Sequence, residues 1–429
     1  MNQGMYFFVK KEWRKLLLLL CMLLLYFFSY FQRVAVPGTC FDELQRDFNT
    51  TAAAITALGS IFLYIYAIAQ FFIGTLADRF GGRRTMLAGA GILACASILF
   101  PLSHSLPMLY LTRAFLAAGA STIFISLVKE IDGLFNPRHF AMWLGVSLFF
   151  GYSGGLAGTY PFERAVSNFG WRDTLFGVGL LCLAALIMAT IVFRTFRVHE
   201  PQRPGVKENY MGAVLRNKLS YPIAIAGAIN FTIYFLFQGP LGKKMLTDCC
   251  AISSAKAASI TFAMMLLSMI FASLAGFISR IIGNRRKPVI LAGVFLTLAA
   301  VVLMALMAQD RPDYRVMETG LLLLGVASFI SPIILTSAKE VNLSSAAATS
   351  MSLTNFAAYV GVALVTNLAG VVMDCFKEQS CLTDRGIIYP VIAYRMIFAG
   401  CAGLAVISAI AAFFIRETRG MYAHEMTQK

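Results

Sequence analysis

Two arginines lie inside long apolar runs of this sequence, where a charged side chain is costly. Arg33 follows Tyr-Phe-Gln in the first run, and Arg113 follows Leu-Tyr-Leu-Thr in a later one. Intramembrane charges usually serve a function, and the planar guanidinium group binds a carboxylate or phosphate with two parallel hydrogen bonds. The pair therefore predicts a site for a small anion. For Arg33 the alternative is a side chain that reaches the outer lipid headgroups from a helix end.

Other polar side chains also interrupt the apolar runs. These candidates for a solute-binding cavity are Tyr64, Tyr152, Asn230, Tyr234, Gln238, Asn355 and Tyr359. Tyrosines and amides in such positions either bind a solute or join neighbouring helices by hydrogen bonds. For any one residue the bridging role is the more common, whereas the whole set suits a solute with several hydrogen-bonding groups.

Acidic residues are missing from the interior of these runs. The nearest are Glu130 and Glu340, which stand at run ends beside Lys129 and Lys339. Buried carboxylates are the usual proton carriers of transporters. Their absence favours exchange, facilitated diffusion or coupling by the substrate itself, and leaves a coupling ion open.

Enzyme signatures are also missing. We find no His/Asp/Glu cluster, no C-x-x-C pair and no phosphate-binding G-x-x-x-x-G-K-[ST] loop. The sequence thus predicts neither a catalytic residue nor a metal or cofactor. Cys375 and Cys381 either pair in an oxidising exterior or remain free thiols.

The elements that position these residues are membrane-spanning helices. Hydrophobic residues make up 59% of the 429 and charged residues only 13%. A helix needs about 20 apolar residues to cross a bilayer, and lipid requires every backbone polar group to be satisfied internally. We expect an all-α membrane protein with spans at 13–35, 52–77, 86–104, 107–130, 139–161, 172–194, 219–242, 256–282, 288–308, 317–339, 346–373 and 390–415.

The basic residues set the expected orientation. With both termini inside, the inner segments hold about twice as many of the 36 Lys and Arg residues as the outer loops. This excess accounts for the net charge of +15 without a nucleic-acid partner. We expect an integral protein of a bacterial plasma (inner) membrane with cytoplasmic termini, monomeric in the lipid bilayer.

One long polar connector divides the chain. Residues 195–218 include two prolines, two glycines and many charges. We expect six-helix bundles at 1–194 and 219–429, with 195–218 as a cytoplasmic linker.

A repeated loop supports the two halves. GTLADRFGGRR covers 74–84, and GFISRIIGNRR covers 276–286, an offset that aligns both glycines and both final arginines. The first copy resembles the loop 2–3 signature of the major facilitator superfamily, G-x-x-x-D-R-x-G-R-R. In the second copy Arg280 replaces the aspartate.

The resemblance implies the major facilitator fold, with twelve transmembrane helices in two pseudo-symmetric six-helix bundles. It also implies that the loop stabilises a closed cytoplasmic gate in the outward-open state. The gate residues carried over are Gly74, Asp78, Arg79, Gly81, Arg83 and Arg84. A charged turn that only obeys the charge rule is the alternative. The glycine-rich run 145–158 and the intramembrane Arg113 resemble further family features.

Arg33 resembles the first-span arginine of organophosphate/phosphate antiporters and anion–cation symporters. The seventh-span arginine of the antiporters is missing, because residues 234–240 read YFLFQGP. We therefore expect a secondary active or facilitative transporter of a small organic anion that works by alternating access. Efflux of amphipathic drugs and a transporter-like solute sensor are the alternatives.

Overall fold

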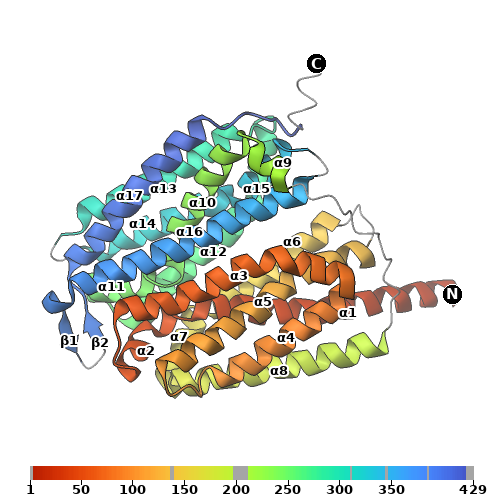
Figure 1. Ribbon diagram of the computed structural model, residues 1–429, viewed down its shortest axis with the longest axis horizontal. Coiled ribbons are helices and arrows are strands. Elements are labelled where there is room, and N and C mark those ends of the chain that lie inside the picture. Colours follow the sequence, from red (N-terminus) through yellow and green to blue (C-terminus); the bar gives the residue numbers. More distant parts are fainter. Residues whose placement is uncertain are drawn as a thin grey trace. The chain divides into compact units, whose positions relative to one another are not determined.

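The structure is a computed structural model that describes residues 3–135, 140–196, 211–309, 312–343, 346–383 and 386–421. The chain forms two compact units (Figure 1). Unit 1 comprises Met1–Arg33, Ile68–Gly158 and Ala165–Val206; unit 2 comprises Val34–Ala67, Thr159–Arg164 and Lys207–Lys429. The expected all-α membrane fold is confirmed, because the described residues are overwhelmingly helical and ten helical segments are long and apolar enough to span a bilayer.

Unit 1 is built from long helices whose outer faces remain apolar. They are α1 (Gln3–Ala35), the second half of α3 (Ala52–Phe80), α4 (Gly82–Leu99), α5 (Leu106–Leu134), α6 (Phe140–Ala157) and α8 (Trp171–Thr195). In the most apolar stretch of α8, only 28% of the residues are buried inside the protein. Its exposed positions include Leu181 and Ile191, each 60% exposed, as expected for a helix that faces lipid.

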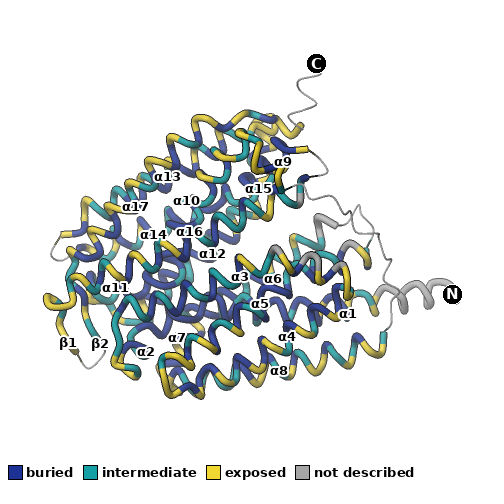
Figure 2. Tube along the Cα trace, viewed as in Figure 1, coloured by how far each residue is buried: buried dark blue, intermediate teal, exposed yellow. Residues whose placement is uncertain are grey.

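Unit 2 contains the spans of the C-terminal half together with the first half of α3. These helices are α10 (Ser220–Gln238), α12 (Ser254–Ile281), α13 (Lys287–Met307), α14 (Tyr314–Ala327), α15 (Ser331–Glu340), α16 (Ala347–Cys375) and α17 (Val391–Phe413). A short helix, α9 (Met211–Arg216), precedes them. In Figure 2 buried stripes follow these helices, and one core cluster joins α10, α13, α15 and α17 through residues such as Ile290, Ile330 and Ile334.

Three expected spans are subdivided. The helix expected at 139–161 ends at Ala157 and is followed by α7 (Tyr160–Phe169). The helix expected at 219–242 ends at Gln238, because Gly239 and Pro240 interrupt it. The span at 317–339 contains a 3₁₀ turn, η3 (Ser328–Ile330), just before Pro332, whose ring lacks the N–H of a regular helix.

Short elements also fill the connections between spans. They are η1 (Gly38–Cys40), α2 (Phe41–Asp47), α11 (Gly242–Cys250), η5 (Lys377–Gln379) and the antiparallel pair β1 (Cys381–Thr383) and β2 (Gly386–Ile388). Sequence analysis treated these stretches as loops, because each is too short to show a clear helical or strand period. Cys375 and Cys381 are free and exposed.

Small residues bring α4 and α5 into backbone contact. A Cβ atom added at Gly119 would lie 2.6 Å from both the Gly89 carbonyl oxygen and the Leu93 backbone nitrogen. A Cβ atom at Gly91, on the other face of α4, would meet nothing within 4 Å. Close backbone approach through glycine is a standard way to pack helices in lipid.

Gly119→Ala should therefore destabilise the protein by about 1–3 kcal/mol, because α4 and α5 must separate to admit the methyl group. The matched control Gly91→Ala should be neutral or stabilise by up to about 1 kcal/mol. Thermal unfolding of the purified variants compares them. Equal melting temperatures for Gly119→Ala and Gly91→Ala would show that the two backbones are not in contact there.

Candidate functional site

One of the two intramembrane arginines of unit 1 lies at the C-terminal end of α1, and the other bonds the α1 backbone there. The Arg113 guanidinium group, on α5, donates a hydrogen bond of 2.7 Å to the Gln32 carbonyl oxygen, next to Arg33 in the chain. Arg113 is only 1% exposed and Arg33 only 7%. Two permanent cations are thus concentrated around residues 32 and 33, in surroundings that strengthen their attraction for an anion.

Tyrosines surround Arg33. Its guanidinium carbon lies 3.8 Å from the centre of the Tyr30 ring, a cation–π contact. Tyr30 makes edge contacts with Tyr26 on α1 and with Tyr152 on α6, at centroid distances of 6.0 and 5.4 Å. The structure therefore brings together three predicted site residues, Arg33, Arg113 and Tyr152.

Tyr26 and Tyr30 were missed by sequence analysis, although a signal was present. The two tyrosines are four residues apart and Arg33 comes three residues later, which places all three along one face of a helix. Gly151 makes room for this group, because a Cβ atom there would overlap the Tyr26 ring. We call Arg33, Arg113, Tyr26, Tyr30 and Tyr152 the arginine–tyrosine cluster.

A second aromatic group lies in unit 2. The Phe231 ring contacts Tyr234 on the same helix and Tyr359 on α16, with centroids 6.5 and 5.5 Å apart. Tyr359 also makes an edge contact of 5.1 Å with Tyr66 on α3. The predicted residues Tyr234 and Tyr359 are thus joined through Phe231, which sequence analysis missed because phenylalanine carries no polar group.

Two of the predicted amides join helices instead. The Asn230 side chain donates to Thr297 Oγ1 on α13 at 2.5 Å, and the Gln238 side chain donates to Met265 Sδ on α12 at 3.2 Å. Both are buried, so they bridge α10 to its neighbours, the alternative role weighed for this set. Asn355 on α16 and Tyr64 on α3 are half-buried.

The loop between α3 and α4 is organised by glycine and arginine. Gly81 adopts φ +89° and begins α4, a conformation that favours glycine. Arg83 Nε lies 2.8 Å from Glu130 Oε2 at the end of α5, and both residues are buried. Arg79 and Arg84 are exposed. Gly74 and Asp78 lie in α3, but their side chains are outside the described residues.

The second copy of the loop repeats this pair. Gly283 adopts φ +75°, and Arg286 is 3.0 Å from Glu340 at the end of α15. The two positive-φ glycines keep the aligned register, whereas the pairing arginine is one residue later in the second copy. In the second copy Glu417 accepts hydrogen bonds from the Arg286 and Lys287 backbone N–H groups at the start of α13.

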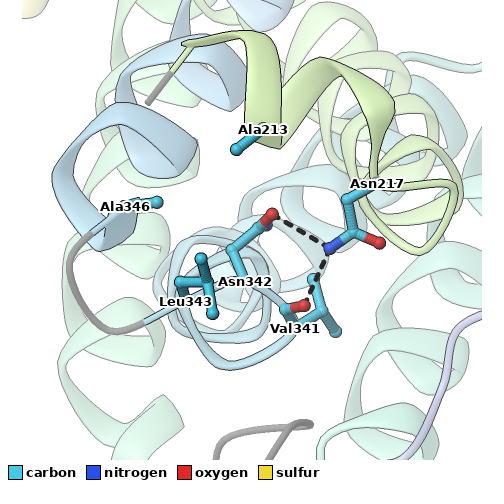
Figure 3. A pocket seen from close by; sticks show the side chains of 6 residues that line it. All are labelled: Ala213, Asn217, Val341, Asn342, Leu343 and Ala346. Carbon is cyan, nitrogen blue, oxygen red and sulfur yellow. Dashed lines mark hydrogen bonds between the residues drawn. The ribbon is translucent and has the colours of Figure 1, made fainter. Parts of the chain in front are cut away.

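A small pocket lies where α9 meets the turn between α15 and α16 (Figure 3). Its volume is about 190 Å³, and Asn217 and Asn342 face each other across it. The Asn217 amide donates to the Asn342 side-chain oxygen and to the Val341 carbonyl oxygen at 2.9 and 2.8 Å. These bonds attach the start of the C-terminal half to the end of α15, so the polar groups of the pocket serve packing.

The family model of the Major Facilitator Superfamily matches residues 18–366. The chain belongs to this superfamily. A bacterial homologue of the human lysosomal transporter Spinster, solved in an inward-facing and unoccupied conformation, is similar in fold, with a TM-score of 0.76, 17% identity and coverage of 95% of this chain and 98% of that one.

Two curated relatives match part of the chain. The uncharacterized MFS-type transporter YvkA of Bacillus subtilis is 28% identical over 165 residues, which is 38% of this chain and 36% of that protein. Human monocarboxylate transporter 2 is 29% identical over 167 residues, 38% of this chain and 34% of its own length. The match thus spans about a third of each relative.

Proposed function

We propose that this transporter moves a small organic anion by alternating access and that the arginine–tyrosine cluster binds the anionic group. The observation that carries the proposal is the burial of two arginines: Arg33 on α1, and Arg113 on α5, which donates to the carbonyl oxygen of the residue before Arg33. Two cations in a low-dielectric environment attract an anion strongly and repel cationic drugs. Tyrosine hydroxyls supply further donors for a carboxylate.

The partial similarity to a monocarboxylate transporter supports the same class of substrate. A carboxylate matches the fork of a guanidinium group, and tyrosine rings suit a short apolar body. The substrate class proposed is therefore a small carboxylate with one apolar portion. The Arg83–Glu130 and Arg286–Glu340 pairs are proposed to stabilise the cytoplasmic ends of the two halves during the cycle.

A thermal-shift screen tests binding directly. Purified protein should be stabilised by small carboxylates, by about 2.7 kcal/mol at a ligand concentration of 100 times Kd. The matched carboxamides, which have the same shape without the charge, should leave the melting temperature unchanged. Stabilisation by neutral or cationic compounds, with none by carboxylates, would contradict the anion site.

The proposed orientation is tested by labelling intact cells with a membrane-impermeant thiol reagent. The exposed native Cys381 should react from outside. A cysteine introduced at exposed Gly212, at the end of the connector, should react only after the cells are opened. Reaction of Gly212→Cys in intact cells would reverse the proposed topology.

A further inference from the structure

A buried ion cluster joins the segment after the first span to the C-terminal half. Lys244 on α11 is 2% exposed, and its ammonium group lies 2.6 Å from Asp42 Oδ1 on α2 and 2.9 Å from Asp248 Oδ1 on α11. It also donates to the Ile387 carbonyl oxygen of β2 at 2.5 Å. The Lys244 ammonium group thus has two hydrogen-bond acceptors, and the Asp42 carboxylate lies within ion-pair distance. We call Asp42, Lys244 and Asp248 the Lys244 cluster.

Asp248 is held on its other side by residues of the C-terminal half. Its Oδ2 atom accepts hydrogen bonds from the Tyr394 hydroxyl at 2.7 Å and from the Tyr389 backbone N–H at 3.1 Å. Lys244 and Asp248 are four residues apart on one helix, so they remain paired if α2 moves away. Asp42 is the only member of the cluster that comes from outside the C-terminal half.

The cluster carries excess negative charge. When both are ionised, two carboxylates share one ammonium group. The neighbouring cation, Lys243, does not neutralise the excess charge, because its ammonium group is engaged elsewhere. Lys243 donates to the Thr39 carbonyl oxygen and lies 3.9 Å from Glu163 Oε1. Burial raises the pKa of the nearby Glu43, and Lys243 opposes this rise. An uncompensated buried charge is costly, so closing α2 onto this site favours uptake of a proton.

Other bonds hold the same segment to the C-terminal half. The Asp374 carboxylate on α16 accepts the Ala52 and Ala53 N–H groups at the start of α3, each at 2.9 Å. The Gln45 amide donates to the Tyr389 hydroxyl at 2.9 Å. In Figure 1, α2, α11, β1 and β2 lie at one end of unit 2. In the proposed orientation this is the outer end.

We propose that the Lys244 cluster is a proton-binding site in the outer gate, where a proton binds as α2 closes onto α11 and leaves as α2 opens. This inference rests on the proposed function and its orientation. The gate is defined as the contacts of η1 and α2 with α11 and β2. When the gate opens, Asp42 departs, the neutral Lys244–Asp248 pair remains, and the proton is released to the outside.

The pKa of Asp248 decides whether low or high pH favours the closed gate. The titratable groups that face it are Lys244 and Cys249 on α11, Asp42 on α2, Tyr394 on α17 and Tyr389 just before α17. Burial raises the pKa of Asp248 to about 6, Lys244 opposes the rise, and Asp42 adds to it. A carboxyl group with a raised pKa in the closed state binds its proton more tightly there. The stabilisation of the closed gate by protonation is therefore complete below pH 3.8, the ordinary pKa of Asp248. It is lost as the pH rises through about 6.

Native Cys40 reports whether the gate is open. It lies in η1 and is 0% exposed in the closed gate. Intact cells are treated with a membrane-impermeant maleimide at about pH 5, within the expected transition, and at about pH 8, above it. Peptide mass spectrometry reads the labelled fraction of Cys40, and the exposed Cys381 in the same sample corrects for reagent chemistry.

Asp248→Asn mimics the protonated cluster. At pH 8 it should slow Cys40 labelling relative to wild type by about tenfold. This is the change expected if the pKa of Asp248 falls by about one unit when the gate opens. At pH 5, where wild type is partly protonated, the difference between the two proteins should be much smaller. The control Asp47→Asn alters an exposed carboxylate of α2 and should behave like wild type at both pH values.

Asp42→Asn provides a second variant that leaves Asp248 and its three hydrogen bonds in place. It removes the extra carboxylate, which adds to the rise in the pKa of Asp248, so its corrected Cys40 labelling should change less between pH 5 and pH 8 than that of wild type. A constant ratio of wild type to Asp248→Asn across this range would overturn the proposal. So would a wild-type-like pH response in Asp42→Asn.

Anion exchange, measured in vesicles from the same cells, separates this proposal from the proposed function. Exchange without the pH-dependent labelling defeats the proton site alone. The expected labelling without exchange defeats the proposed transport of anions and leaves the proton site intact.

Discussion

Arg33→Lys should raise the Kd for the anionic substrate by about tenfold or more, equivalent to about 1.4 kcal/mol. Lysine keeps the charge but cannot form the two parallel hydrogen bonds of a guanidinium group. It also weakens the cation–π contact of Arg33 with the Tyr30 ring, where the guanidinium carbon is 3.8 Å from the ring centre. Substrate titrations followed by thermal shift or intrinsic fluorescence measure the change.

The matched control is Arg395→Lys, on an exposed face of α17. It should leave both the Kd and the melting temperature at the wild-type values. Arg33→Lys should also melt close to wild type, because the cation and much of the aliphatic stem are retained. Wild-type affinity in Arg33→Lys would mean that the side chain only reaches towards lipid headgroups, and the case for an anionic substrate would lose its main support.

Glu130→Ala should destabilise the protein by about 3–5 kcal/mol, the usual effect of removing one partner of a buried ion pair. Arg83 Nε is 2.8 Å from Glu130 Oε2, and both side chains are almost fully buried. Without Glu130, the Arg83 cation stays in the protein without its carboxylate. Thermal or chemical unfolding in detergent measures the loss.

Two further variants test whether the loss of stability in Glu130→Ala comes from the unpaired Arg83 cation. Arg84→Ala removes the neighbouring exposed arginine and should change stability by less than about 0.5 kcal/mol. The double variant Arg83→Met/Glu130→Leu replaces the pair with apolar side chains and should recover most of the stability lost in Glu130→Ala. A wild-type melting temperature for Glu130→Ala would show that the pair does not stabilise the end of α5.

The spans were predictable because lipid imposes a strong and simple requirement. Twenty apolar residues in a row satisfy it, so the ends of α12 and α13 agree with the expected spans to within two residues. The short elements were not predictable, because their stability comes from tertiary contacts. The Lys244–Asp248 pair on α11 illustrates this: its spacing of four residues is visible in the sequence, but its burial depends on α2 and β2.

The candidate site was predictable in part for a related reason. A charge in an apolar run stands out, so Arg33 and Arg113 could be singled out without a structure. Polar residues in the same runs could not be divided between binding and bridging. Asn230 bonds Thr297, a residue 67 positions away, and no local pattern indicates that contact.

Counterflow in proteoliposomes tests the central claim most directly. Vesicles with the purified protein are loaded with an unlabelled small carboxylate and diluted into a trace of the labelled compound, with protein-free vesicles and the matched carboxamide as controls. We predict transient accumulation of labelled carboxylate above its equilibrium level, and none of the carboxamide. Exchange of neutral or cationic solutes without any carboxylate, or binding of the carboxylate with no exchange, would contradict the account.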